Sequence, residues 1–267
     1  MRSDAAPAPL GLKLAAGAGL LFLLAPLAII FVYAFTTEEK SYQWPPPGFT
    51  TQWLAVTWGR ADVWAALGLS VRVAAVSTGI ALVLGTLCAA AVSRTKFFGR
   101  ETVSLLVILP IALPGIITGI ALRSAFNLAE IPFSFWTIVL GHATFCIVVV
   151  YNNAVARFRR MSGSLIEASM DLGANGFQTF RYVVLPNIAP GVGAGAVFAF
   201  LASFDEATVA FFISGVEGKT ITRKLFEDID YNLTPVIAAA STVMVVLSLA
   251  LMGGVEWLRA RGDRSAP

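Results

Sequence analysis

The chain has 267 residues, of which 57% are apolar and only 13% are charged, and its mean hydropathy is +0.77. A soluble domain carries about 25% charged residues, so this composition excludes an ordinary soluble protein and indicates an integral membrane protein. The formal net charge of +3 is too small and too scattered to indicate a nucleic-acid partner. Cys88 and Cys146 lie in apolar runs without metal-ligand spacing. The single histidine, His142, is expected to be buried and hydrogen-bonded, so no metal site is predicted.

Six apolar segments are long enough to cross the ~30 Å hydrocarbon core of a bilayer, which takes about 20 residues of α-helix. They lie at about residues 14–35, 66–92, 103–126, 133–155, 190–213 and 236–258. Pro110 and Pro114 are expected to kink the third segment. The sequence therefore predicts an all-α integral membrane protein with six transmembrane helices. They form one domain, residues 14–258, between tails of residues 1–13 and 259–267.

The first segment has the position of a cleaved signal peptide, but its composition differs. Its apolar run exceeds the roughly 7–15 residues of a signal core. Thr36-Thr37-Glu38-Glu39 follows it without a cleavage site of small residues. We therefore expect the first span to be retained.

The distribution of basic residues predicts the orientation. Twelve of the 19 Lys and Arg residues lie in the two tails and in the connections after the second and fourth segments. By the positive-inside rule, both termini and the connection of residues 156–189 are expected to be cytoplasmic. The loops of residues 36–65 and 214–235 then lie outside. Trp53 and Trp58 in the first of them are expected to join the aromatic belt at the membrane interface.

The most informative polar stretch is residues 167–186, within the connection of residues 156–189. Ser164 and Glu167 have the spacing of a capping box, and apolar residues follow at helical spacing. Gly173 permits a backbone conformation that ends this first short helix. A second short helix is expected after it. Two short helices between membrane spans cannot bury their own apolar sides, so this segment is expected to dock on a partner.

The residues of this segment resemble the EAA loop of permease subunits of binding-protein-dependent ABC importers. The match rests on Glu-Ala-Ser, a glycine six residues after the glutamate, and a closing Val-Val-Leu-Pro. In that family the loop docks in a groove of a separate ATP-hydrolysing subunit. The resemblance implies that the residues of this coupling loop are Glu167, Ala168, Ser169, Gly173, Leu185 and Pro186. Ser169 in place of alanine and Val183 in place of isoleucine are small departures from the family pattern.

Further stretches resemble the polyamine branch of these permeases, the spermidine/putrescine type. They are residues 48–53, 141–146, 203–206 and 234–239. The resemblance implies a bacterial inner-membrane protein that forms a heterodimer with a second permease, and works with two ATP-binding cassette subunits and an external binding protein. Importers of opines, aminophosphonates, thiamine or iron share much of this sequence and remain alternatives for the substrate.

The chain itself is not expected to be an enzyme. The nearest phosphate-loop candidate, Gly218-Lys219-Thr220, lacks the glycine five residues earlier, where Ile213 stands. No catalytic residue and no cofactor are therefore expected in this chain. ATP and Mg²⁺ are expected on the partner ATPase subunits.

The fifth segment carries adjacent carboxylates, Asp205 and Glu206, and a pair of glycines, Gly191 and Gly195, spaced for close helix contact. A carboxylate at the centre of a span costs about 2.5–3.5 kcal/mol, so this pair should face protein or water. It is either a cation-attracting patch on the substrate pathway or a structural pair that hydrogen-bonds a neighbour. Consecutive helical residues diverge by ~100°, so the two side chains should point different ways. An ion-coupled secondary transporter that uses this pair is a further alternative.

Overall fold

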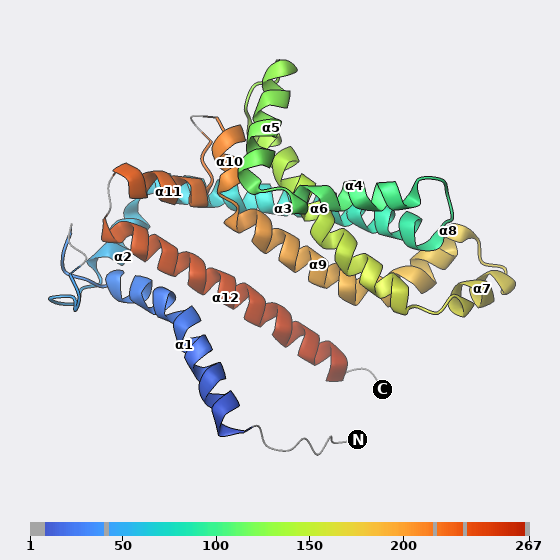
Figure 1. Ribbon diagram of the computed structural model, residues 1–267, viewed down its shortest axis with the longest axis horizontal. Helices are drawn as coiled ribbons and strands as arrows, with labels where there is room; N and C mark the ends of the chain where they lie inside the picture. Colours follow the sequence, from blue (N-terminus) through green and yellow to red (C-terminus); the bar gives the residue numbers. More distant parts are fainter. Residues whose placement is uncertain (1–8, 40–42, 216–217, 232–233, 265–267) are drawn as a thin grey trace. The chain divides into compact units, whose positions relative to one another are not determined.

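The computed structural model describes residues 9–39, 43–215, 218–231 and 234–264 (Figure 1). The predicted all-α fold is confirmed. In the described residues the regular structure is helical, and the one pairing of extended backbone is an isolated bridge between Thr36 and Phe49. Residues 1–8 and 265–267 of the predicted tails lie outside the described residues.

The described helices follow one another in a fixed order. They are α1 (Leu10–Tyr33), α2 (Gln52–Gly59), α3 (Ala61–Arg94), α4 (Arg100–Ala112), α5 (Gly115–Leu128), α6 (Phe135–Arg160), α7 (Ser164–Asp171), α8 (Gly176–Thr179), the π-helical η1 (Phe180–Val184), α9 (Leu185–Asp205), α10 (Thr208–Ile213), α11 (Ile221–Tyr231) and α12 (Pro235–Arg264). The chain divides into two compact units. Unit 1 comprises Met1–Val63 and Asp228–Pro267, and unit 2 comprises Trp64–Glu227.

Five helical runs in the described chain are long and apolar enough to cross a membrane. They are α1, α3, α6, the run Gly176–Asp205, and α12 as far as Gly254. Each overlaps one predicted span. The third predicted segment, residues 103–126, is instead covered by two helices, α4 and α5, so the described chain has up to six spans if this bent pair counts as one.

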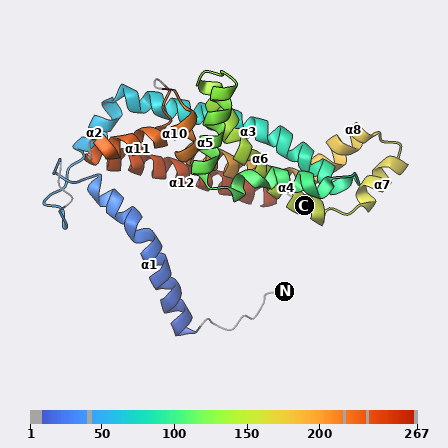
Figure 2. The ribbon, with the colours of Figure 1, turned by 45° about the horizontal axis from the view of Figure 1, so that its top comes forward.

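The third segment is broken rather than kinked. α4 and α5 differ in direction by 106°, and Figure 2 shows the turn between them. Leu113 is extended, with φ −89° and ψ 140°, and Pro114 caps α5. A proline disfavours helical backbone at the residue before it, so α4 ends at Ala112. Pro110 lies inside the last turn of α4 and does not interrupt it.

In unit 1, α12 packs against α1 and α2. The centre of this contact is Trp53, which is buried and packs with Ala34, Val236 and Ala239. Its Nε1 donates a hydrogen bond to the carbonyl of Thr36 at 2.7 Å. Trp53 is therefore a core residue of unit 1, packed against protein and not exposed to lipid. An indole N–H that finds a buried carbonyl allows this large side chain to be buried.

In unit 2, α6 is the central helix and packs along α9 (Figure 1). The contact is close because Gly191 and Gly195 lie on the facing side of α9, as their spacing predicted. A Cβ at Gly195 would lie 3.1 Å from Cα of Val150 and 3.2 Å from Cβ of Asn153 on α6. A Cβ at Gly191 would meet the side chain of Arg157. Without side chains here, the two backbones approach as small residues allow in membranes.

The loop predicted at residues 214–235 contains an amphipathic helix, α11, which was not predicted. Ile221 and Leu225 are buried on one side of it. The carboxylate of Glu227 accepts hydrogen bonds from Lys219 Nζ at 2.5 Å and Arg223 Nε at 2.9 Å. Burial by itself raises the pKa of Glu227, but the hydrogen bonds and charges of Lys219 and Arg223 outweigh burial, so the pKa lies below its ordinary value.

The close contact of α6 and α9 predicts a position-specific effect of larger side chains. We expect Gly195→Leu to lower the free energy of unfolding by about 1–3 kcal/mol, the usual cost of overpacking. Gly193→Leu is the matched control, because a Cβ at Gly193 meets nothing within 4 Å. Thermal unfolding of the purified protein in detergent measures both. Equal effects of the two changes would contradict the close contact.

The ion pairs of Glu227 predict a pH dependence. Because its pKa is depressed in the folded state, its stabilisation is present above the unfolded pKa of about 4.3 and is lost as the pH falls through the folded pKa. We expect Glu227→Gln to lower stability at pH 7 by about 1 kcal/mol or less, and the difference from wild type to shrink below about pH 4. The control is Asp230→Asn, an exposed acid of α11 with no ion pair among the described residues. A constant difference at all pH values would contradict this account.

Candidate functional site

The predicted docking residues lie in the connection between α6 and α9. α7 is a separate short helix, whereas α8, η1 and α9 form one helical run, Gly176–Asp205. The expected second short helix is thus not a separate element but the first part of the helix of the fifth predicted span. Figure 1 shows α7 and α8 at the end of unit 2 where α6 ends.

Gly173 makes the turn after α7. Its φ is +85°, a conformation that costs an L-residue with a Cβ roughly 1–2 kcal/mol. Its N–H donates to the carbonyl of Met170 at 2.8 Å, and the N–H of Ala174 donates to the carbonyl of Ser169 at 3.1 Å. These bonds satisfy the last carbonyls of α7. The predicted helix end at Gly173 is confirmed.

The predicted capping box of Ser164 and Glu167 is wrong. Gly163 occupies the N-cap position of α7 and has no side chain to offer, so Ser164 is already the first helical residue. A capping box is present instead at α8. There Asn175 Oδ1 accepts the N–H of Gln178 at 2.9 Å, and Gln178 Oε1 accepts the N–H of Asn175 at 2.8 Å.

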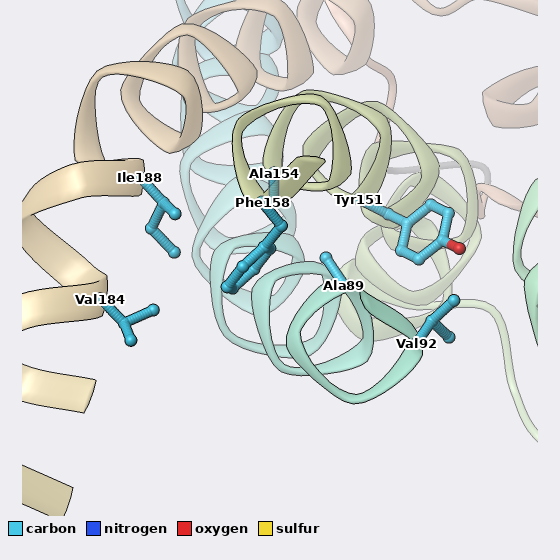
Figure 3. Packing of buried hydrophobic residues seen from close by; sticks show 7 residues of the cluster. All are labelled: Ala89, Val92, Tyr151, Ala154, Phe158, Val184 and Ile188. Atoms are coloured by element: carbon cyan, nitrogen blue, oxygen red, sulfur yellow. The ribbon is translucent and has the colours of Figure 1, made fainter. Parts of the chain in front are cut away.

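A buried apolar cluster joins the segment to the rest of unit 2. Figure 3 shows its members, which come from three parts of the chain: Ala89 and Val92 of α3, Tyr151, Ala154 and Phe158 of α6, and Val184 of η1 with Ile188 of α9. Leu185 and Ile166 pack against this cluster. Ser169 Oγ lies 3.0 Å from Thr179 Oγ1 and connects α7 to α8. The base of the segment is therefore packed against α3 and α6.

The outer side of the same segment exposes large apolar side chains. Leu172 is 90% exposed, Phe177 76% and Tyr182 72%. Glu167 and Ala168 are also exposed. Large apolar side chains exposed along one short connecting segment are typical of a surface that binds a partner.

The predicted docking residues do not all share that surface. Glu167, Ala168 and Pro186 are exposed, and Ser169 is half-buried in its contact with Thr179. Leu185 packs inward against the apolar cluster. The exposed aromatic residues Phe177 and Tyr182 are not among the predicted docking residues, because the sequence pattern assigned them to the second short helix.

Two prolines, Pro186 and Pro190, lie in the first turns of α9. A proline inside a helix lacks the N–H donor, and its ring clashes with the carbonyl four residues earlier. Directly before Pro186 the helix widens into η1, and Asn187 Nδ2 donates to the carbonyl of Val183 at 2.7 Å. The wider turn and this side-chain bond let the helical run continue past Pro186.

The other end of the run is the acidic pair. α9 ends at Asp205, and Glu206 leaves the helical conformation. Glu206 Oε1 accepts the N–H of Val209 at 2.8 Å and so caps the first turn of α10, while its carbonyl accepts a bond from Thr222 Oγ1 at 3.1 Å. Asp205 is exposed and makes no hydrogen bond or ion pair among the described residues. The two carboxylates therefore have different surroundings, and Glu206 has a structural role.

A buried polar contact lies two residues before this break. His142 Nδ1 on α6 lies 2.8 Å from Ser203 Oγ on α9, and both side chains are buried. The prediction of a buried, hydrogen-bonded histidine is confirmed. The contact fixes the register of α6 against α9 close to the acidic pair.

Comparison with known proteins identifies related chains. A family model described as "Binding-protein-dependent transport system inner membrane component" matches residues 81–262. The spermidine/putrescine transport system permease protein PotC of Escherichia coli K12 is 30% identical over 231 residues, covering 86% of this chain and 87% of PotC. The putrescine transport system permease protein PotI of the same strain is 30% identical over 255 residues, covering 92% of this chain and 89% of PotI.

A sulfate transport system permease protein, CysT of Salmonella typhimurium LT2, is 28% identical over 276 residues and covers 95% of this chain and 94% of its own length. Among solved structures, a bacterial ABC transporter that imports the acidic polysaccharide alginate has a similar fold. Its TM-score is 0.71 at 17% identity, covering 91% of this chain and 93% of that chain. At this identity the likeness shows the fold alone.

The capping contact predicts different effects of two changes at one position. Glu206→Ala removes the acceptor for the N–H of Val209 and should lower the free energy of unfolding by about 1 kcal/mol. Glu206→Gln keeps an oxygen acceptor and should change stability little. Asp205→Ala is the neighbouring control and should leave thermal unfolding in detergent unchanged. A loss for Glu206→Gln as large as for Glu206→Ala would contradict the capping role.

Proposed function

This chain belongs to the family of inner-membrane components of binding-protein-dependent transport systems, and on that premise we propose its cargo and partners. It is a permease subunit of an ABC importer. We infer that it forms half of the translocation pathway and that the substrate is a polyamine, such as spermidine or putrescine.

Two observations support a polyamine. The similarity to PotC and PotI extends over most of this chain and of each relative. The exposed carboxylate of Asp205 at the end of α9 is free to attract a cation. Sulfate, the cargo named for CysT, is the contrasting candidate, since an unpaired carboxylate repels an anion. Opines, aminophosphonates, thiamine and iron are further alternatives.

The proposed partners are a second permease in a heterodimer, two ATP-binding cassette subunits that bind ATP and Mg²⁺, and an external binding protein. The open apolar surface of Leu172, Phe177 and Tyr182 supports a protein partner at this end. The excess of Lys and Arg in the tails and in the connection of residues 156–189 supports a cytoplasmic position for both termini and for this surface.

The helical run Gly176–Asp205 supports a mechanism of coupling. It comprises 30 residues and is therefore about 45 Å long at 1.5 Å per residue. One end carries the exposed docking surface and the other end carries Asp205. A displacement imposed by ATPase subunits on the first end would be transmitted along this helix and its partner α6 to the second, which opens or closes the path in alternating access.

The substrate is tested by reconstituting the chain with its partner subunits in liposomes. We expect ATP-dependent uptake of spermidine, and we expect Asp205→Asn to lower that uptake about tenfold, since hydrogen bonds to charged groups contribute about 1.5–3 kcal/mol. Thermal unfolding and ATP hydrolysis of the variant serve as controls and should stay near wild type. Uptake of sulfate rather than spermidine would contradict the proposed cargo.

The coupling role is tested by two proline substitutions three residues apart. Proline cannot adopt the φ of +85° at Gly173, so Gly173→Pro should abolish uptake while ATP hydrolysis continues. Gly176 is the first residue of α8, where proline is tolerated, and Asn175 before it is already extended, so Gly176→Pro should keep uptake coupled. The ratio of substrate transported to ATP hydrolysed is the measurement. Normal coupling in Gly173→Pro would refute the assignment.

A further inference from the structure

Unit 2 contains a cavity of about 800 Å³ that the transport site does not include. It lies where α3 and α6 end and α4 begins. Its polar lining includes Ser93, Lys96, Arg100, Thr102, Ser104 and Arg159. Tyr151 Oη and Ser104 Oγ lie 2.8 Å apart in its wall.

Positive charge dominates this lining. Lys96, Arg100 and Arg159 all line the cavity, against a single acid, Glu101. None of the three cations has an ion-pair partner among the residues that the structure describes. Arg94 nearby is different, because its guanidinium donates to the carbonyls of Phe158 and Met161. Three cations without protein partners around one hollow favour an anionic occupant.

The first turn of α4 adds to this preference. α4 has 13 residues, begins after Gly99, has no side-chain cap, and carries one acid, Glu101, in its first turn. The first N–H groups of an uncapped helix and its dipole attract anions, phosphates above all.

Apolar groups adjoin the charged lining. Phe97 is 41% exposed and Phe98 is fully exposed, and Val92, Val155 and Phe158 also line the cavity. α3 and α6 are apolar helices long enough to cross a membrane, and the cavity lies at their ends. The spans predicted at residues 66–92 and 133–155 place these ends near the surface of a bilayer. Exposed phenylalanines at this depth fit acyl chains and not bulk water. The occupant should therefore join an anionic head to an apolar tail.

We propose that this cavity binds the head group of an anionic phospholipid, such as phosphatidylglycerol. The phosphate lies among Lys96, Arg100 and Arg159, and the acyl chains lie along Phe97 and Phe98. Basic pockets between membrane helices bind such head groups through the same chemistry. The proposal depends on the membrane position of α3 and α6, and not on the cargo of the transporter.

The test is native mass spectrometry of the full chain, with phosphatidylglycerol and phosphatidylcholine of matched acyl chains added in turn. We expect the wild type to retain phosphatidylglycerol in preference to phosphatidylcholine. Arg159→Gln should weaken that preference about fivefold, since each basic residue near an anionic lipid contributes about that factor. Arg160→Gln is the matched control: it is the next residue of α6, carries the same charge, is exposed, and does not line the cavity.

The outcomes distinguish a bound lipid head group from free phosphate and from nonspecific attraction to a basic surface. The site is supported if the preference for phosphatidylglycerol is lost in Arg159→Gln and in the double variant Lys96→Gln/Arg100→Gln. Arg160→Gln should keep that preference. Equal losses in Arg159→Gln and Arg160→Gln would show a diffuse basic surface and overturn it. Displacement of phosphatidylglycerol by millimolar inorganic phosphate, with no preference over phosphatidylcholine, would overturn the lipid assignment. Thermal unfolding of each variant confirms that the binding data come from folded protein.

Discussion

The packing of α6 against α9 is the constraint on which the rest of unit 2 depends. Their backbones meet where Gly195 lies against Val150 and Asn153. Little hydrophobic force acts between helices in lipid, so close van der Waals contact and buried hydrogen bonds must hold them together. The bond between His142 and Ser203 is one such contact, and the cluster around Phe158 and Ile188 is another at the opposite end. Both ends of α9 are thereby held in register with one neighbour.

This arrangement gives the two ends of one helix different chemistry. At the start, the inward side chains Val184 and Ile188 are buried while Phe177 and Tyr182 remain open. At the other end, the helix stops at Asp205, and the carboxylate of Glu206 accepts the N–H that it caps in the first turn of α10. The proposed coupling rests on two features of this helical run: the exposed apolar side chains near its start and the unpaired carboxylate of Asp205 at its end.

The proposed head-group site at the ends of α3 and α6 gives the positive charges of this region a second function, besides orienting the chain in the membrane. The positive-inside rule treats Arg159 and Arg160 alike, because it counts charges and ignores their surroundings. In the folded chain only Arg159 lines a hollow beside exposed phenylalanines. Orientation in the membrane needs net charge, whereas binding of a head group needs charges that converge.

The sequence by itself determined the helical class, the approximate spans, the family and the turn at Gly173, because hydropathy, charge bias and glycine chemistry act over short stretches of chain. It also indicated the close contact of α9 through Gly191 and Gly195. Only the tertiary structure decided that Trp53 is buried, since its partner, the carbonyl of Thr36, lies 17 residues away. The same holds for the different surroundings of Asp205 and Glu206, which depend on where α10 begins. Local patterns fix which residues can form a helix, but the partner of each polar group depends on what the folded chain brings beside it.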